Sequence, residues 1–484
     1  MTTTALRKCT ADSIIEPLDC RPQAESVAVS FARDTAPAIL ETQTSVGSYG
    51  PFSIYACDPV DVVEIAGSTT AAPATTMPLT ALAQCIARYP KIEHSAPDGP
   101  FCGGWIGYIG YEAGLSIEGL APATIHDVDI PLLRFGLYDS AAVLDRRTGR
   151  WYATAVDWPE PFCRRRPSAA RRIRAIRERL NQAATVPPKE SRRSVHAAAP
   201  RASMTRQAYE SAVARAKQHI EAGDIYQVNL TQRFSTTTDM TPIELFLRLR
   251  RVSPAPYAAL LSWRDRAVIS SSPELFLRLG GGHVVTRPIK GTRPRHVDPS
   301  TDRALREELV RSEKDRAELN MIVDLLRNDL GRVCEYGSVR VIDPGEIEQH
   351  PTVYHRVATI EGRLRTDAGW LDLLTATLPG GSITGAPKIR AMQIINELEP
   401  TARTAYCGAI GLIGLDGSLS LNVAIRTMVQ VGSSVHVYAG GAIVADSTAD
   451  EEYEEIMAKA DGMFAALGCP RPTARQITTG VANK

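Results

Sequence analysis

The chain has 484 residues, of which 44% are hydrophobic, with 55 Lys and Arg against 54 Asp and Glu. This length permits a large core and two or three domains' worth of chain, and the balanced charge excludes a general attraction to nucleic acid or membranes. No apolar run approaches the length of a membrane span. The nine cysteines are scattered and never form a C-x-x-C pair, which predicts reduced thiols in a cytoplasmic protein rather than disulfides or a zinc site.

Residues 1–163 are interpreted as mostly short strands and turns. Alternating or β-branched runs at 26–34, 53–67 and 135–157 predict strands. The glycine-rich stretch 103–112 has neither the G-K-[ST] of a phosphate loop nor the spacing of a dinucleotide fingerprint. It predicts a strand packed closely against other backbone.

Residues 164–204 differ in composition from the chain before them. Arginine recurs from 164 to 179, and Ile173, Ile176 and Leu180 form one narrow apolar stripe, which predicts a solvated helix. No aromatic residues interleave for base stacking, so a nucleic-acid site is disfavoured. The stretch 184–203 is rich in Pro, Ser and Ala and is predicted to be an exposed linker.

A second block begins at Thr205, a plausible helix N-cap, and its helix ends near Gly223. The next run, 224–233, alternates as a strand whose polar positions include Gln227 and Asn229. These two amides could face water or line a cleft, and the pattern favours neither.

A lysine and a carboxylate stand out in the following strands. Lys290 lies in the segment 287–295, where a strand is predicted to end in a loop, and Glu274 precedes it by sixteen residues, just after a proline. Lysine is a nucleophile only when its ammonium is destabilised by desolvation or neighbouring cations. Spacing alone favours a surface salt bridge over an acid/base pair.

Two predicted helices each carry an acidic pair at a spacing of three. One helix is predicted over 302–330 and includes Asp315 and Glu318, and the final helix, capped near Thr448, carries Glu452 and Glu455. Carboxylates without His or Cys suit a hard ion such as Mg²⁺. Lys459 shares the stripe of the second pair.

The last third is predicted to be a β meander. Asp416-Gly417 is a hairpin signal, and one strand over 418–431 would turn Arg426 away from its apolar face, where it could bind a carboxylate. The backbone amides of a turn at 439–442 suit an oxyanion. His355, in a predicted strand, is more often a packed histidine than a catalyst when seen in isolation.

Several motifs together resemble the chorismate-utilising enzymes. They are, in chain order, SSPE, RPIKGTRPR, DRAELNMIVDLLRNDLGRV, LPGGSITGAPKIRAM, YCGAIG, AIRTM, AGGAIVADS and EEYEEIMAKA. The resemblance is dense over about 205–465 and weaker before. It implies an α/β (α+β) fold of two face-to-face antiparallel sheets flanked by helices, with the active site between the sheets. The expected segments are a β-rich part of the same fold (1–163), an Arg-rich helix and linker (164–204), the chorismate-binding region (205–467) and a tail (468–484).

Two positions discriminate between branches of that family. Isochorismate and salicylate synthases have a lysine where this chain has Gln227, and anthranilate synthases have an alanine where it has Lys290. The resemblance therefore implies the branch that converts chorismate and ammonia to 4-amino-4-deoxychorismate, toward 4-aminobenzoate and folate. The alternatives are the anthranilate-forming branch and a non-catalytic, tryptophan-binding regulatory relative.

The resemblance also implies roles for individual residues. Lys290 attacks C2 of chorismate while Glu274, assisted by His355, protonates the departing C4 hydroxyl, and ammonia then adds at C4 and expels Lys290. Mg²⁺ is expected on Glu318 and Glu455, with Asp315 and Glu452 supporting its waters. The expected substrate-binding residues are Arg426 and Tyr406 for the enolpyruvyl carboxylate, Gly440 and Gly441 through their amides, and Thr384, Gln227, Gly291, Thr292 and Lys459. One departure is Ala442, where relatives often have glycine.

The ammonia needs a source. No cysteine here lies in the G-x-C-x-G context of glutamine amidotransferases, so a separate amidotransferase subunit is predicted. Residues 38–42 loosely resemble the feedback motif of anthranilate synthases and leave tryptophan as an open ligand for the N-terminal region.

Overall fold

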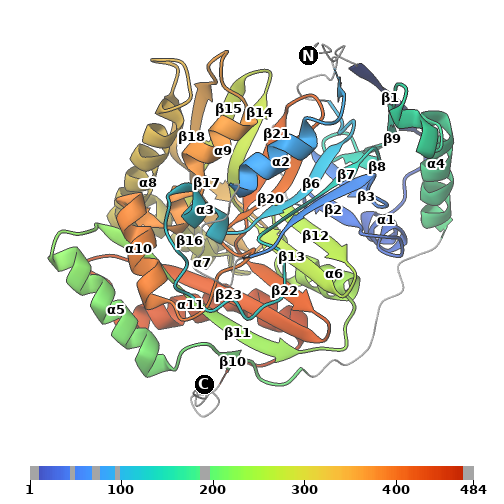
Figure 1. Cartoon of the computed structure of the whole chain (residues 1–484). Helices are drawn as coiled ribbons and strands as arrows, with labels where there is room; N and C mark the ends of the chain where they lie inside the picture. The colour runs from blue at the N-terminus through green and yellow to red at the C-terminus, as the bar shows by residue number, and fades with distance from the viewer. Residues whose placement is uncertain (1–9, 44–49, 68–76, 93–98, 186–196, 473–484) are drawn as a thin grey trace.

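The computed structural model describes residues 10–43, 50–67, 77–92, 99–185 and 197–472. Their strands form two large sheets with helices around them (Figure 1), which confirms the predicted fold class. Strands from the N-terminal part pair with strands from the C-terminal part in both sheets, for example β2 with β12 and β6 with β20. The two parts of the chain are therefore interleaved.

The first sheet has 13 strands among the described residues. Their order is β10 (Arg201–Ala202), β11 (Gln227–Thr237), β23 (Ser434–Ile443), β22 (Thr427–Val431), β13 (Arg266–Ser272), β12 (Tyr257–Trp263), β2 (Ala38–Glu41), β3 (Phe52–Ala56), β8 (Ser140–Asp145), β9 (Arg150–Asp157), β1 (Thr10–Leu18) and β5 (Lys91–Ile92), with β19 (Gly385–Ala386) beside β11.

The second sheet has ten strands in the same part of the chain. Their order is β16 (Ile289–Pro294), β18 (Val353–Arg363), β15 (His283–Arg287), β14 (Leu275–Gly280), β21 (Leu419–Val423), β20 (Ala409–Gly414), β6 (Gly104–Ile109), β7 (Leu133–Tyr138) and β4 (Asp61–Ile65), with β17 (Arg340–Gln349) beside β18.

Helices cover the outer faces of both sheets (Figure 1). They are α1 (Ala24–Phe31), α2 (Pro78–Ile86), α3 (Glu112–Ile117), α4 (Ala169–Thr185), α5 (Arg206–Glu221), α6 (Pro242–Val252), α7 (Pro299–Arg311), α8 (Glu313–Gly331), α9 (Trp370–Thr377), α10 (Lys388–Leu398) and α11 (Ala449–Leu467). Helix α11 packs on β23, α4 on β9, and α8 on β16 and β18. Among the described helices, none has the length and apolar character that a membrane crossing requires.

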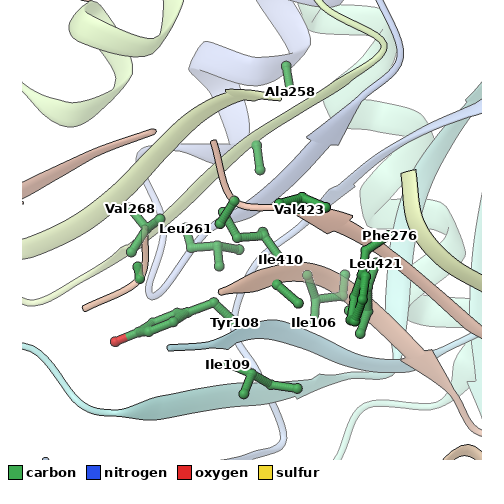
Figure 2. Packing of buried hydrophobic residues seen from close by; sticks show 14 of the residues in the cluster. Ile106, Tyr108, Ile109, Ala258, Leu261, Val268, Phe276, Ile410, Leu421 and Val423 are labelled. Atoms are coloured by element: carbon green, nitrogen blue, oxygen red, sulfur yellow. The ribbon is translucent and has the colours of Figure 1, made fainter. Parts of the chain in front are cut away.

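The core lies where the sheets face each other. Figure 2 shows side chains of β6, β20 and β21 against side chains of β12 and β13, with Ile106, Ile410 and Leu261 among them. Strand β6 runs between β20 and β7, and a Cβ added at Gly104 would lie 2.5 Å from the carbonyl oxygen of Ile413. The glycine-rich stretch is thus a closely packed strand, as predicted.

Two elements differ from the sequence prediction in type or extent. The run 26–34 forms helix α1 rather than a strand, because Val27, Ala28 and Phe31 recur at helical spacing and are buried together. The single helix predicted over 302–330 is two helices, α7 and α8. The break is at Ser312, whose backbone is extended and whose hydroxyl accepts a hydrogen bond from the Asp315 N–H at 3.2 Å.

The strand predicted over 418–431 is also two elements. The hairpin at Asp416-Gly417 is confirmed, since β20 pairs with β21 across it and Gly417 has φ +83°. Beyond Val423, however, the chain leaves the second sheet and continues as β22 in the first, and Arg426 between them has φ +48°. A local alternation pattern cannot show that a strand changes sheet.

The Arg-rich helix was predicted correctly as a helix with a solvated face, since Arg171, Arg174 and Arg177 are exposed, but the burial of Arg172 was not predicted. Its apolar stripe of Ile173, Ile176 and Leu180 is buried, and Arg172 is buried as well, donating to the carbonyl oxygens of Asp139 at 2.7 Å and Val156 at 2.6 Å. The middle of the predicted linker, 186–196, and the end of the tail, 473–484, lie outside the described residues.

Candidate active site

Two short crossings between the sheets bring charged side chains together. The chain leaves the first sheet between β13 and β14, where Glu274 lies, and returns between β21 and β22, where Arg426 lies. The Val423 N–H donates to the Glu274 carbonyl at 3.1 Å, and the Ser271 N–H donates to the Arg426 carbonyl at 3.0 Å. The crossings therefore support each other, and both side chains are placed at the joint between the sheets.

Glu274 and Lys290 lie near enough at this joint to act on each other electrostatically. The side chain of Glu274 is buried, and the Ser382 hydroxyl and the N–H of Ile289, the residue before Lys290, stabilise the charged form of its carboxyl group. Burial raises the pKa of Glu274 to about 7, although Ser382, Lys290 and the Ile289 N–H each oppose the shift. Glu274 is buried and Lys290 is half-buried, and no salt bridge joins them in the part of the chain that the structure describes, unlike the surface salt bridge that spacing alone favoured.

Lys290 has the environment that a nucleophilic amine needs. Burial lowers its pKa and Lys459 lowers it further, while Glu318, Glu274 and Glu455 oppose the shift. Among the described residues, its ammonium has no hydrogen bond or ion pair within the usual distances. An amine with a lowered pKa near a carboxyl group with a raised pKa is suited to nucleophilic attack coupled to proton donation.

The two acidic pairs meet around Lys290. Glu318 of α8 and Glu455 of α11 both act electrostatically on the lysine and on each other. Burial raises the pKa of Glu318 and of Glu452. One carboxylate oxygen of Glu452 accepts from the Ser447 hydroxyl at 2.6 Å, and its buried Oε2 has no partner in the described part of the chain.

Asp315 and Gly291 pack together beneath the lysine segment. Gly291 has φ +87°, and a Cβ added there would lie 2.9 Å from the side chain of Asp315. Asp315 also lies 3.2 Å from the Arg293 guanidinium. Any other residue at 291 would be strained and would displace helix α8, which carries Glu318.

The donor set fits a hard divalent cation. It consists of carboxylates alone, and the unpartnered Oε2 of Glu452 is a buried acceptor without a donor. In the described residues, no three of these carboxylates have ligand atoms within 4.8 Å of one another; Asp34, Cys57 and Asp58 are the group that does. Negatively charged carboxylates repel one another when no cation lies between them. One of them already has a positive partner, since the Lys459 ammonium lies 2.6 Å from Glu455 Oε1.

Arg426 and His355 form the opposite side of the site. Within the described residues, the Arg426 guanidinium makes no hydrogen bond or ion pair, and burial lowers its pKa. Burial, with smaller contributions from Arg426 and His350, holds the pKa of His355 well below its usual range. Nδ1 of this neutral ring lies 2.9 Å from the Thr292 hydroxyl, across the β16–β18 pair. A half-buried guanidinium without a partner among the described residues is suited to a ligand carboxylate.

Three further residues predicted to bind the substrate are Tyr406, Gly440 and Gly441. Tyr406 stacks on Tyr438 at 5.4 Å, and the next N–H, that of Cys407, donates to Ala424 in the second crossing. Gly440 and Gly441 lie within strand β23, opposite Thr231 and Leu230, so the turn predicted at 439–442 is wrong. The close approach of Thr231 and Glu452 to these glycines explains the pattern that suggested a turn.

The strand amides do not face water. Gln227 is fully buried, and neither atom of its amide has a hydrogen-bond partner among the described residues. Asn229 donates to the Ser382 carbonyl oxygen at 2.8 Å. Thr384 is buried too, and its hydroxyl donates to the Gly380 carbonyl oxygen at 3.0 Å, so it supports the loop that carries Ser382.

Sequence comparison identifies the family. A sequence model described as chorismate binding enzyme matches residues 37–465. The chain belongs to the chorismate binding enzymes. Aminodeoxychorismate synthase component 1 of Salmonella typhimurium is 38% identical over 436 residues, 89% of this chain and 92% of the relative. Anthranilate synthase component 1 of Streptomyces coelicolor is 39% identical over 443 residues, 90% and 84% of the two chains.

A solved chorismate binding enzyme has the same fold. Anthranilate synthase component I from Streptococcus pneumoniae superposes with a TM-score of 0.74 at 31% identity, covering 87% of this chain and 93% of that one. Because relatives with both names are equally similar, overall identity does not decide between their reactions. That choice depends on individual side chains in the site.

Two residues of this chorismate binding enzyme were missed from the sequence. Ser382, which stabilises the charged form of Glu274, lies in the LPGGSITGAPKIRAM motif but was given no role. Arg403 is 1% exposed and pairs with Glu399, and it donates to the carbonyl oxygens of Ile383 and Asn229, both at 2.9 Å. It therefore joins the Ser382 loop to strand β11. The only available signal was the spacing of four between Glu399 and Arg403, which is also common on exposed helices.

Proposed function

We propose that this enzyme aminates chorismate at C4 to give 4-amino-4-deoxychorismate, using Lys290 as a covalent nucleophile. The observation that carries the proposal is that the half-buried Lys290 acts electrostatically on the buried Glu274; the pKa of the lysine is lowered and that of the glutamate is raised. An alanine at this position would leave Glu274 with no amine beside it. The aminodeoxychorismate synthase relatives support the same choice.

The reaction then has two balanced displacement steps. The neutral amine of Lys290 forms a bond to C2, the ring double bonds shift, and the C4 hydroxyl leaves as water with the proton of Glu274. Ammonia next forms a bond to C4, the double bonds shift back, and the C2–N bond to Lys290 breaks, releasing the lysine amine. The ammonium formed at C4 then returns a proton to the Glu274 carboxylate. The enolpyruvyl group is retained throughout. His355, whose Nδ1 lies 2.9 Å from the Thr292 hydroxyl, would assist near the leaving hydroxyl.

Binding is assigned to the charged groups around this pair. Arg426 and Tyr406 would bind the enolpyruvyl carboxylate, with Gly440, Gly441 and Gln227 lining the same site. Glu318 and Glu455 would hold Mg²⁺, with Asp315 and Glu452 behind them. When bound, that ion would anchor the ring carboxylate and neutralise its charge.

The ammonia is proposed to come from a separate glutamine amidotransferase. The relatives carry the name component 1, which supports a second component. Free ammonium should replace that partner in vitro.

Product analysis tests the proposal directly. The purified chain is incubated with chorismate, Mg²⁺ and ammonium, and the products are separated by chromatography. We expect 4-amino-4-deoxychorismate and no pyruvate. Anthranilate with an equal amount of pyruvate would overturn the assignment in favour of the anthranilate branch. Product formed from glutamine alone, with no second protein, would overturn the need for a partner.

A further inference from the structure

Lys459 occupies a central position among the charged groups of the site. It lies one turn after Glu455 on α11, and its ammonium nitrogen is 2.6 Å from Glu455 Oε1 and 2.9 Å from the Gly440 carbonyl oxygen of β23. One ammonium therefore joins a proposed metal ligand to a strand of the substrate site.

The surrounding charges explain why a cation lies there. Glu455 of α11 acts electrostatically on Glu318 of α8 and on Glu452 of α11. Burial raises the pKa values of Glu452 and Glu455, and the positive charge of Lys459 lowers them. Lys314 of α8 acts on the same three carboxylates, but it is exposed and forms no ion pair with them. Lys459 is thus the contacting cation of the acidic cluster, whereas Lys314 acts from a distance.

The ion pair between Lys459 and Glu455 is weak enough for another cation to replace the lysine. The side chains of Lys459 and Glu455 are 43% and 50% exposed, and half-exposed ion pairs are weak because water competes for both charges. A divalent cation satisfies the same carboxylates with twice the charge and accepts several oxygen ligands at once.

We propose that Lys459 is the resident counter-cation of the metal site, displaced from Glu455 when the divalent cation binds. Displacement frees the ammonium for a carboxylate of the substrate. Metal binding then prepares the anion site, and by linkage the anion strengthens metal binding. The inference rests on the metal site of the proposed function, but it does not depend on which product the enzyme forms.

Metal binding without substrate tests the inference. Mn²⁺ replaces Mg²⁺, and free Mn²⁺ is measured by electron paramagnetic resonance with the full chain, without chorismate. Lys459→Met removes the competing cation and should bind Mn²⁺ about three- to tenfold more tightly than the wild type. Lys459→Arg keeps the cation and should not gain affinity. Unchanged or weaker binding by Lys459→Met would overturn the proposal.

Lys314→Met is the matched control for the general electrostatic field. It removes one positive charge that acts on the same carboxylates without touching them, so its effect should fall below twofold at about 0.3 M salt. The effect of Lys459→Met should persist there. If both variants changed the Mn²⁺ affinity equally, Lys459 would act only as a distant charge, and its displacement by the metal would be refuted. If Lys459→Met does not fold, Lys459→Gln replaces it in the Mn²⁺ measurement, with its folding checked by circular dichroism. An anthranilate product would refute the proposed function and leave this measurement intact.

Discussion

Two buried glutamates in this enzyme have the same raised pKa and different surroundings. Burial raises the pKa of both Glu274 and Glu112 to about 7, and both side chains are at most 5% exposed. Glu112 accepts hydrogen bonds from the N–H groups of Arg403 and Thr404, and the buried Arg403 lies near it. Glu274 instead lies beside Lys290, whose amine has no bonded partner within the described residues. A raised pKa marks both places, but only Glu274 lies beside an amine available for chemistry.

Removing Lys290 should have the largest effect on activity. Lys290→Ala leaves no nucleophile, so formation of 4-amino-4-deoxychorismate should fall by about a thousandfold or more. The thermal unfolding temperature should not decrease, because a desolvated ammonium is removed. Initial rates with ammonium and calorimetric melting measure the two effects. Turnover within tenfold of the wild type would remove the covalent step.

Changing Glu274 should come next. Glu274→Gln keeps the shape of the side chain but cannot donate a proton, so kcat should fall by about a hundredfold or more. The matched variant Glu112→Gln should retain activity within about threefold, since Glu112 touches no reacting group. Equal losses in the two variants would mean that the buried environment, rather than proton donation, controls the rate.

The hydroxyl of Ser382 should set the pH range of the acid. Glu274 must be protonated to act, so kcat/KM should fall as the pH rises through about 7. Ser382 stabilises the charged carboxylate, and Ser382→Ala should therefore move this limb upward by about one pH unit. Ser382→Thr keeps a hydroxyl and should restore the wild-type limb. A lower rate with no movement of the limb would assign Ser382 a purely structural role.

The smallest effect is expected from titration of Glu112, which should change the stability of the folded state and not the activity. Its folded pKa of about 7 lies above the ordinary value of 4.5, so the native state binds the proton more tightly than the unfolded chain does. The wild type should therefore lose stability as the pH rises from about 4.5 to 7. Melting temperatures across this range should fall more for the wild type than for Glu112→Gln. Parallel curves would show that Glu112 does not titrate there.

The sequence allowed the site to be predicted mainly through ordered motifs. Lys290, Glu274 and both acidic pairs were singled out from the residues, and the family resemblance supplied their roles; in the structure Glu318, Glu274 and Glu455 all act electrostatically on Lys290. Their spacing in the chain could not show this, because β13 and β14 lie in different sheets and helices α8 and α11 are far apart in sequence. Pairing across sheets is a tertiary property with no local period.

Other features were missed for physical reasons. The break between α7 and α8 had a local signal in the cap formed by Ser312 and Asp315, which the continuous apolar pattern hid. Arg172 and Arg403 were missed as interior groups because charged residues are read as exposed by default. Their burial depends on carbonyl oxygens supplied by distant segments.

The shortness of the two sheet crossings also determines how the molecule can move. Two residues separate β13 from β14 and three separate β21 from β22, and backbone hydrogen bonds join the crossings. The sheets cannot slide or part at this point without breaking those bonds, so the spacing between Glu274 and Arg426 is fixed by the covalent chain. Any widening that admits a substrate must occur at the outer edges, where β16 and α8 face α11. The molecule is therefore stiffest at the joint that carries Glu274, the proposed acid, and Arg426, the proposed anion-binding residue.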